Sequence, residues 1–237
     1  MKPGGSATLG LLVLLGLGAA GACGTAPPPA VDFSSTPTSY AGTDYPEVYQ
    51  RWTRHGKVVH EFEAALEVWA TYKSFDYREA YVAHYADAYR LSTADRELIH
   101  SGQREIGADA YEFMVTAQSA NYRWNDLERK GSAWRVTLLD GLGHEIAPEK
   151  ISSEKLPETY EREFFPAKTP FTRIYVVRFS RHAPEVARAP AAGGAAVSAV
   201  SPVASSGEDG FVGERSGRLV LRLAGPFGAL DLVWSTH

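Results

Sequence analysis

Hydrophobic and polar residues alternate along much of this chain, which is the pattern of β-strands with one buried face. The longest alternating run covers residues 58–72 and predicts one long or bent strand. Its expected buried face comprises Val58, His60, Phe62, Ala64, Leu66, Val68, Ala70 and Tyr72. Shorter runs predict further strands near residues 111–117, 134–138, 146, 175–179, 219–223 and 230–234. Residues 225–228, Gly-Pro-Phe-Gly, have the composition of a hairpin turn between the last two strands.

The spacing of hydrophobic residues changes to that of helices between residues 76 and 107. Asp76 and Glu79 have the spacing of a capping box at a helix start, and a second start signal lies at Ser92. The second helix is expected to use Leu98, Ile99 and Ile106 and to end near Gly107. This segment therefore predicts a helical hairpin inserted between strands.

A further short helix is predicted before the first strand. Asp44 can cap it, Pro46 suits its first turn, and Gly56 can end it. Its expected buried residues are Val48 and Trp52.

Many short strands separated by turns indicate an antiparallel β-sandwich, so the expected fold is mainly β with the helical insertion, α+β overall. One domain is expected over residues 45–237. It is interrupted at 183–216, where Ala, Pro, Gly, Ser and Val dominate. Because such a composition buries little surface, this segment is predicted to be a disordered loop.

The first 22 residues have the organisation of an export signal. Lys2 supplies a positive start, and residues 9–22 form an uncharged run of Leu, Gly, Ala and Val. This run is shorter than the roughly 20 apolar residues that a spanning helix needs. A cleaved signal peptide is therefore favoured over a permanent transmembrane anchor.

The run ends Ala20-Gly21-Ala22-Cys23, which resembles the lipobox of bacterial lipoproteins, in which the cysteine thiol receives diacylglycerol. The sequence departs from that motif at Ala20, where leucine is usual. The resemblance implies cleavage between Ala22 and Cys23 and a membrane tether of lipid on Cys23. The same Ala-x-Ala also fits an ordinary signal peptidase, which would release a soluble protein. Residues 23–44, rich in Pro, Ser and Thr, are predicted to be a flexible linker.

The lipobox resemblance also implies a location in the bacterial cell envelope. Gly24 is not the aspartate that in many Gram-negative cells retains lipoproteins at the inner membrane. The outer membrane is therefore favoured if the cell is Gram-negative.

The predicted sandwich loosely resembles the immunoglobulin-like modules of bacterial envelope lipoproteins. The resemblance rests on 134–138 (Trp-Arg-Val-Thr-Leu), the turn leading to Ile146 and Pro148, the Phe-Phe-Pro segment at 164–166, and the closing hairpin 225–234. It covers about half of the chain, and the cysteine pair of antibody-type domains is absent. A fold of this kind implies no particular activity.

Charge and cysteine content exclude several functional classes. The formal net charge is −4 with no dense block of Lys and Arg, so nucleic acid is not expected as a partner. The single cysteine rules out an internal disulfide and a cysteine-rich zinc site. No cofactor or metal is expected.

Motifs for catalysis are missing from the sequence as well. The seven histidines are scattered, without the HExxH pattern of zinc proteases, and no G-x-S-x-G nucleophile elbow is present. Glu61, Glu63 and Glu67 share one predicted strand face, as a glycosidase pair would require, but a solvated face explains them more simply.

Four tyrosines at intervals of four residues form a stripe along the first predicted helix. We call Tyr77, Tyr81, Tyr85 and Tyr89 the tyrosine stripe. Aromatic faces bind sugar rings and peptides, so the stripe is a candidate surface for an envelope protein or glycan. Packing of the helix onto the sandwich or onto its helical neighbour explains the same spacing more simply.

The sequence therefore predicts a lipid-anchored envelope protein that acts as a non-catalytic binding or assembly module. The alternative is an envelope hydrolase whose site assembles from distant residues. A purely structural spacer is the third hypothesis.

Overall fold

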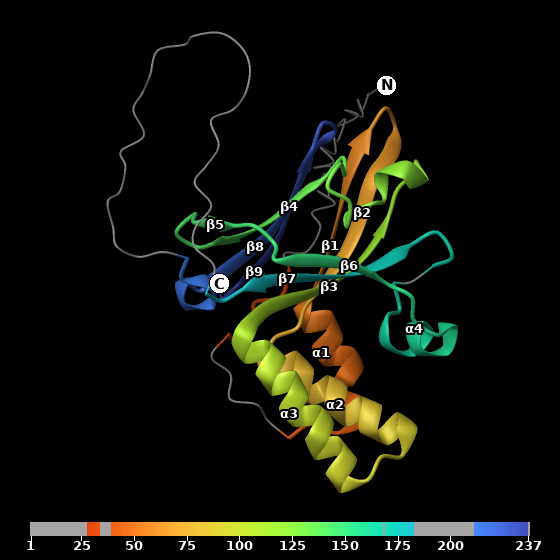
Figure 1. The fold of residues 1–237 in the computed structure, drawn as a ribbon, viewed down its shortest axis with the longest axis vertical. Coiled ribbons are helices and arrows are strands. Elements are labelled where there is room, and N and C mark those ends of the chain that lie inside the picture. Colours follow the sequence, from red (N-terminus) through yellow and green to blue (C-terminus); the bar gives the residue numbers. More distant parts are fainter. Residues whose placement is uncertain (1–27, 34–38, 168, 183–210, 237) are drawn as a thin grey trace, which may run out of the picture.

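Two antiparallel β-sheets and a group of helices at one end make up the fold (Figure 1). This computed structural model describes residues 28–33, 39–167, 169–182 and 211–236. The predicted signal peptide, Cys23 and residues 183–210 of the predicted loop lie outside these ranges. The expectation of a mainly antiparallel β-protein with helices, α+β overall, is confirmed.

The first sheet has five strands in the order β1-β2-β3-β7-β6. Their bounds are Thr53–His60 for β1, Glu63–Tyr72 for β2, Ala110–Gln118 for β3, Arg173–Ser180 for β7 and Lys150–Glu154 for β6. The second sheet has the order β5-β4-β8-β9. Its strands are Glu145–Ile146 (β5), Arg135–Asp140 (β4), Arg218–Gly225 (β8) and Gly228–Ser235 (β9).

The two sheets enclose one hydrophobic core, because residues of both belong to a single cluster of buried side chains. Phe113 of β3 and Trp234 of β9 lie at its centre, with ring centroids 5.2 Å apart. At one side β1 and β9 meet, where the buried Arg54 donates from Nε to the Val233 carbonyl at 2.7 Å.

Helices α1 (Tyr45–Trp52), α2 (Phe75–Tyr89) and α3 (Thr93–Asp109) gather at the lower end of the molecule in Figure 1. A shorter helix, α4 (Glu158–Phe164), lies beside them and packs on α2 through aromatic side chains. Three single turns of 3-10 helix complete the fold: η1 (Gly42–Asp44), η2 (Tyr122–Trp124) and η3 (Gly213–Ser216).

The single strand predicted over 58–72 is wrong, because the chain reverses in its middle. Glu61 and Phe62 have φ of 49° and 67° and form a two-residue turn between β1 and β2. Positive φ at both central residues matches the right-handed twist of a hairpin. The turn places His60 and Phe62 outside the core, whereas Leu66, Val68, Ala70 and Tyr72 are buried as expected.

The first helix forms but ends earlier than predicted. Trp52 is its last residue, and Gly56 lies inside β1, where a β-carbon would come within 2.5 Å of Leu230. Gly56 therefore permits close approach of β1 to β9. Val48 and Trp52 are buried as predicted.

The helical hairpin starts at a different cap from the predicted one. Ser74, not Asp76, is the N-cap of α2, because its hydroxyl accepts from the Tyr77 backbone N–H at 3.0 Å. Asp76 is buried instead and bonds to α1. Ser92 caps α3 as predicted, whereas Leu98 of that helix is exposed rather than packed.

Part of the predicted linker packs against the domain. Val31 is buried and its N–H donates to the Ser235 carbonyl at 2.9 Å, while Phe33 packs on Trp52. Beyond the undescribed part of the predicted loop, Phe211 packs on Tyr111. Bulky hydrophobic residues, rare in these Pro- and Ala-rich segments, account for both contacts.

Candidate functional site

The tyrosine stripe runs from the core to the surface along α2. Tyr77 is buried, Tyr81 and Tyr85 are half-buried, and Tyr89 is 50% exposed. Successive rings are in contact, with centroids 6.3, 5.9 and 4.5 Å apart.

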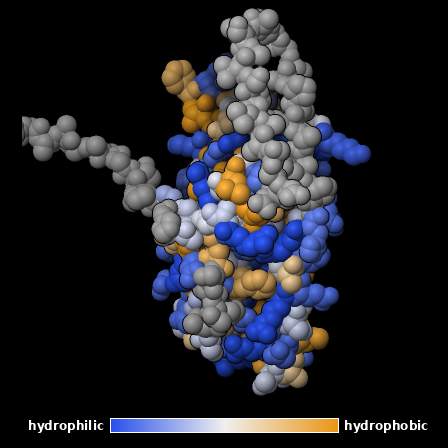
Figure 2. Space-filling view, turned by 90° about the vertical axis from the view of Figure 1, so that its left-hand side faces the viewer, coloured by the Kyte–Doolittle hydropathy of each residue, from blue (hydrophilic) through white to orange (hydrophobic). Residues whose placement is uncertain are grey.

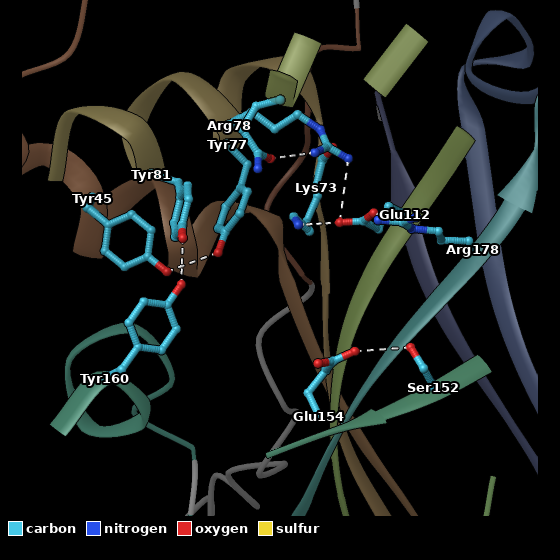
Figure 3. A network of polar contacts seen from close by, with 11 residues as sticks. Tyr45, Lys73, Tyr77, Arg78, Tyr81, Glu112, Ser152, Glu154, Tyr160 and Arg178 are labelled. Carbon is cyan, nitrogen blue, oxygen red and sulfur yellow. Dashed lines mark hydrogen bonds and ion pairs between the residues drawn. The ribbon is translucent and has the colours of Figure 1, made fainter. Parts of the chain in front are cut away.

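This chain's own α4 covers most of the stripe. Tyr160 of α4 packs edge-on against Tyr85, with ring centroids 6.3 Å apart. Its hydroxyl shares a hydrogen bond with that of Tyr81 (Figure 3). Phe164 packs on Tyr81 with ring centroids 5.4 Å apart. Towards the core, the hydroxyls of Tyr45 and Tyr77 lie 3.0 Å apart. The stripe thus contacts α1 and α4 along most of its length, and only its Tyr89 end offers an open aromatic face.

The hydroxyls of the stripe are unsuited to acid–base chemistry. Burial raises the pKa of Tyr45, Tyr77 and Tyr81 above the ordinary value for tyrosine. A phenol whose pKa is raised stays protonated at neutral pH. These groups can therefore donate hydrogen bonds but supply no phenolate base or nucleophile.

A second group of polar residues lies on the outer face of the first sheet, and sheet register brings it together. Lys150 of β6 pairs with Arg178 of β7, and Arg178 pairs with Glu112 of β3. Beyond β2, the Lys73 backbone N–H donates to the Glu112 carbonyl at 2.9 Å. The four side chains therefore form one row across the sheet, with Glu112 the only acid among three bases.

Glu112 is the centre of this row. Its side chain is 1% exposed and accepts from Arg178 Nε at 2.7 Å and, through the other oxygen, from Lys73 Nζ. Arg78 of α2 approaches the same carboxylate, with Nη2 3.8 Å from Oε1 (Figure 3). Three cations therefore share one buried carboxylate.

Two hydrogen bonds to other groups fix the position of the Arg78 guanidinium. Its Nε donates to the Lys73 carbonyl at 2.9 Å and its Nη1 to Gln103 Oε1 of α3 at 2.7 Å. Its Nη2 is buried and makes no hydrogen bond within the described structure. One strong donor thus remains unused beside Glu112, although burying such a donor is costly.

A cavity of about 210 Å³ opens above this row. We call it the Lys73 pocket; the residues that line it are Lys73, Gln103, Ile106, Glu112, Lys150, Ser152, Glu154, Val176 and Arg178. Glu154 accepts from the Ser152 hydroxyl at 3.1 Å. Three cationic side chains, Lys73, Lys150 and Arg178, line the pocket together with the carboxylates of Glu112 and Glu154. Arg78, which does not line the pocket but approaches Glu112, brings the excess to two positive charges.

The charges of the Lys73 pocket perturb each other's protonation. Burial alone would raise the pKa of Glu112, but the positive charges of Lys73 and Arg78 outweigh it and hold that pKa below its ordinary value. Burial lowers the pKa of Lys73, and the adjacent Glu112 carboxylate offsets part of that effect. Glu112 is therefore ionised throughout the neutral range.

Sequence reasoning missed the Lys73 pocket. Its members are spread from Lys73 to Arg178, and β6, which carries Lys150, was not predicted because its residues 150–154 contain one large hydrophobic side chain. The available signal was Glu112, a charged residue within the strongly hydrophobic run 111–117. A charge in a central strand requires a buried partner.

The histidines and acids of the described ranges are not arranged for a metal. They contain no group of three or more His, Cys, Asp or Glu side chains that could hold an ion. His84, for example, contacts the Gly42 carbonyl and Glu163, and His144 contacts Asp140. The predicted strand face of glutamates is also divided, since Glu61 lies in the turn and Glu67 bonds to His55 and Gln118.

Within the same ranges, none of the helices combines the length and the apolar character needed to cross a bilayer. No protein-family model, curated protein or solved structure matches this chain.

Proposed function

We propose that this protein is a lipid-anchored component of the bacterial cell envelope that binds a small anionic group in the Lys73 pocket. The proposal has two parts, a location that rests on the lipobox-like segment before Cys23 and a binding activity that rests on the pocket. Envelope proteins and glycans that carry phosphate or carboxylate groups are the partners that such a pocket suits.

The observation that carries the binding activity is the excess of cations around Glu112. In the buried part of the site two cations, Lys73 and Arg78, face the single carboxylate of Glu112, and an entering anion would offset this buried excess of one positive charge. Lys150 and Arg178 line the opening and supply donors to an entering anion, whereas the Ser152 hydroxyl already donates to Glu154. Phosphate and carboxylate are the groups that Arg and Lys donors bind most strongly.

Binding fits this site better than hydrolysis, the alternative from the sequence. A general acid at neutral pH needs a carboxyl whose pKa is raised, but the surrounding cations lower that of Glu112. The same cations occupy both oxygens of this carboxylate, which leaves it poorly placed to accept a substrate proton.

The binding activity can be tested with simple anions. We expect inorganic phosphate to raise the melting temperature above that in chloride of equal ionic strength, because a ligand that binds only the folded state stabilises it. Acetate and succinate in the same assay separate carboxylate from phosphate preference. Titration calorimetry with phosphate measures the affinity directly.

Variants of two lysines distinguish pocket binding from a general salt effect. Lys150→Ala should weaken phosphate binding, because its ammonium group lines the opening. Lys155→Ala is the matched control, a lysine five positions further along that lines the neighbouring cavity and not the Lys73 pocket. Equal phosphate affinity in wild type and Lys150→Ala, or equal weakening by both variants, would contradict the proposal.

The location can be tested at Cys23. Cys23→Ser should abolish incorporation of labelled fatty acid and release the protein from membranes, since no other cysteine can accept lipid. Ala20→Leu is the control, because it restores the usual lipobox residue and should preserve labelling. A Cys23→Ser protein that remains labelled and membrane-bound would overturn the anchor.

We further propose that the two-sheet body is related to immunoglobulin-like sandwiches. Two antiparallel sheets around one core support this relationship. Cross-strand proton contacts measured by nuclear magnetic resonance test it, and a continuous barrel through hydrogen bonds between β1 and β9 would contradict it.

A further inference from the structure

Three loops from distant parts of the chain meet at the end of the molecule opposite the helices. They are the β1–β2 turn, η2 after β3, and the β8–β9 turn; the first and last lie at the top of Figure 1. Phe227 of the β8–β9 turn joins the other two, since its ring lies 4.1 Å from Trp124 and 5.0 Å from His60. We call this end the aromatic tip.

The aromatic tip exposes large hydrophobic side chains to solvent. Phe62 is 103% exposed, as much as an isolated residue, and Tyr122 and Val59 are 70% and 55% exposed. Figure 2 shows hydrophobic side chains protruding at that end of the molecule. Exposed hydrophobic groups clustered in this way mark a contact surface.

The length of the proposed lipid tether indicates what the aromatic tip contacts. The described chain is already bound to the domain at Pro29, whose carbonyl accepts from Arg54 Nη2 at 2.7 Å, and at Val31. Between Cys23 and Pro29 lie six steps of chain, which reach at most about 20 Å. The domain is therefore held close to the membrane surface rather than lifted from it.

Fully extended, this stretch of chain is just long enough to reach the tip from Arg54. Arg54 and His60 are six residues apart on β1, and a strand rises about 3.3 Å per residue, so the tip lies about 20 Å from the docked chain. A lipid on Cys23 at the end of the extended tether can thus enter the bilayer at the level of the tip, and the helices lie at the other end of the molecule (Figure 1).

We infer that the aromatic tip inserts into the membrane interface and orients the domain on the bilayer, with Phe62 as the most deeply placed side chain. The inference rests on the proposed lipid anchor. Tyrosine and tryptophan favour the interface because they combine an apolar ring with a polar group. Charges at the tip are mixed, with Glu61 and Glu63 beside Phe62 and Arg123 against Tyr122, so insertion is hydrophobic rather than electrostatic.

The test uses site-specific fluorescent labels, which are possible because the chain has a single native cysteine. If Cys23 carries lipid, Phe62→Cys provides one free thiol for a fluorescent label, and Tyr122→Cys provides a second position. Leu98→Cys is the matched control, an exposed hydrophobic residue of α3 at the opposite end. Each labelled, lipid-bearing protein is reconstituted into phosphatidylcholine vesicles with and without nitroxide-bearing phosphatidylcholine.

We expect fluorescence at positions 62 and 122 to shift to shorter wavelength and to be quenched by the nitroxide lipid, while the label at position 98 changes in neither respect. Quenching should persist at high salt. If the protein floats with the vesicles but the labels at positions 62 and 122 are not quenched, insertion of the aromatic tip is contradicted and the lipid anchor is not. Protein that fails to float, with a free thiol on Cys23 by mass spectrometry, would overturn the anchor and the inference with it.

Two other occupants would give different results. A blue shift without nitroxide quenching, growing with protein density, would show contact between copies of the chain and overturn membrane insertion. The measurement is repeated in vesicles that also contain phosphatidylglycerol; quenching that appears only there and disappears with salt would show electrostatic attachment, which also contradicts insertion of Phe62.

Discussion

Trp52 at the end of α1 donates its indole N–H to the carboxylate of Asp76 on α2, at 2.8 Å, and both side chains are buried. Arg51 adds an ion pair to the same oxygen at 3.2 Å. This carboxylate therefore joins the first helix to the helical hairpin, a role that differs from the capping function predicted for it.

Asp76→Ala should lower the free energy of unfolding by about 3 kcal/mol, because it leaves the buried indole N–H unpaired and removes a charged acceptor. Urea denaturation measures the loss. Asp109→Ala, which removes an exposed carboxylate at the end of α3, should change stability by less than about 0.5 kcal/mol. Similar losses in both variants would contradict a special role for Asp76.

Alanine substitutions along the tyrosine stripe should have graded effects. Tyr77→Ala removes a fully buried ring and should cost about 4 kcal/mol, whereas Tyr89→Ala should cost less than about 1 kcal/mol. Chemical denaturation of the two variants provides the comparison. Equal costs would mean that the stripe does not run from the core at Tyr77 to the surface at Tyr89 as described.

The acid stability of the protein should depend on Glu112. Its pKa in the folded protein lies below the ordinary value of 4.5, so the unfolded chain binds the proton more tightly. The stability that Glu112 contributes is therefore complete above that value and is lost as pH falls through the folded pKa. Denaturation midpoints measured between neutral and acidic pH should show this loss.

Glu112→Gln should be less stable than wild type at neutral pH and should lose less stability on acidification. The control is Glu105→Gln, which alters an exposed carboxyl of α3 and should keep the wild-type acid profile. If Glu112→Gln also keeps that profile, the cations do not stabilise the Glu112 carboxylate.

Arg90 ends α2 in the left-handed region, with φ of 54° and ψ of 44°. Because glycine adopts this conformation without a steric cost, Arg90→Gly should raise stability by about 0.5–1 kcal/mol. Arg96→Gly, the same change inside α3, should lower it by about 1 kcal/mol. Thermal denaturation distinguishes the two, and destabilisation by both would contradict the cap.

The sequence predicted those elements well in which the hydrophobic residues keep the same spacing from one end of the element to the other. The buried faces of β3, β7, β8 and β9 follow from their alternation, and the start of α3 follows from Ser92. The β1–β2 turn was missed because Glu61 and Phe62 are not the glycine or asparagine residues usual at positive φ. Context from neighbouring strands overrides local preference there.

The candidate site was harder to predict than the strands. Lys73, Glu112 and Arg178 become neighbours only through the register of β3 with β7 and through the end of β2. No local pattern encodes that register. The tyrosine stripe, in contrast, was visible from its spacing, but the residues of α4 that cover it gave no signal, since few large hydrophobic side chains mark that helix.

The hydrogen bond from Val31 to Ser235 joins positions near opposite ends of the chain. The ribosome must synthesise β9 before this bond can form, because Val31 and Ser235 lie far apart in the sequence. The segment that follows Cys23 therefore cannot dock by this bond early in biogenesis. Until β9 is in place the segment around Val31 lacks this contact, so completion of β9 is the step that fixes that segment on the domain.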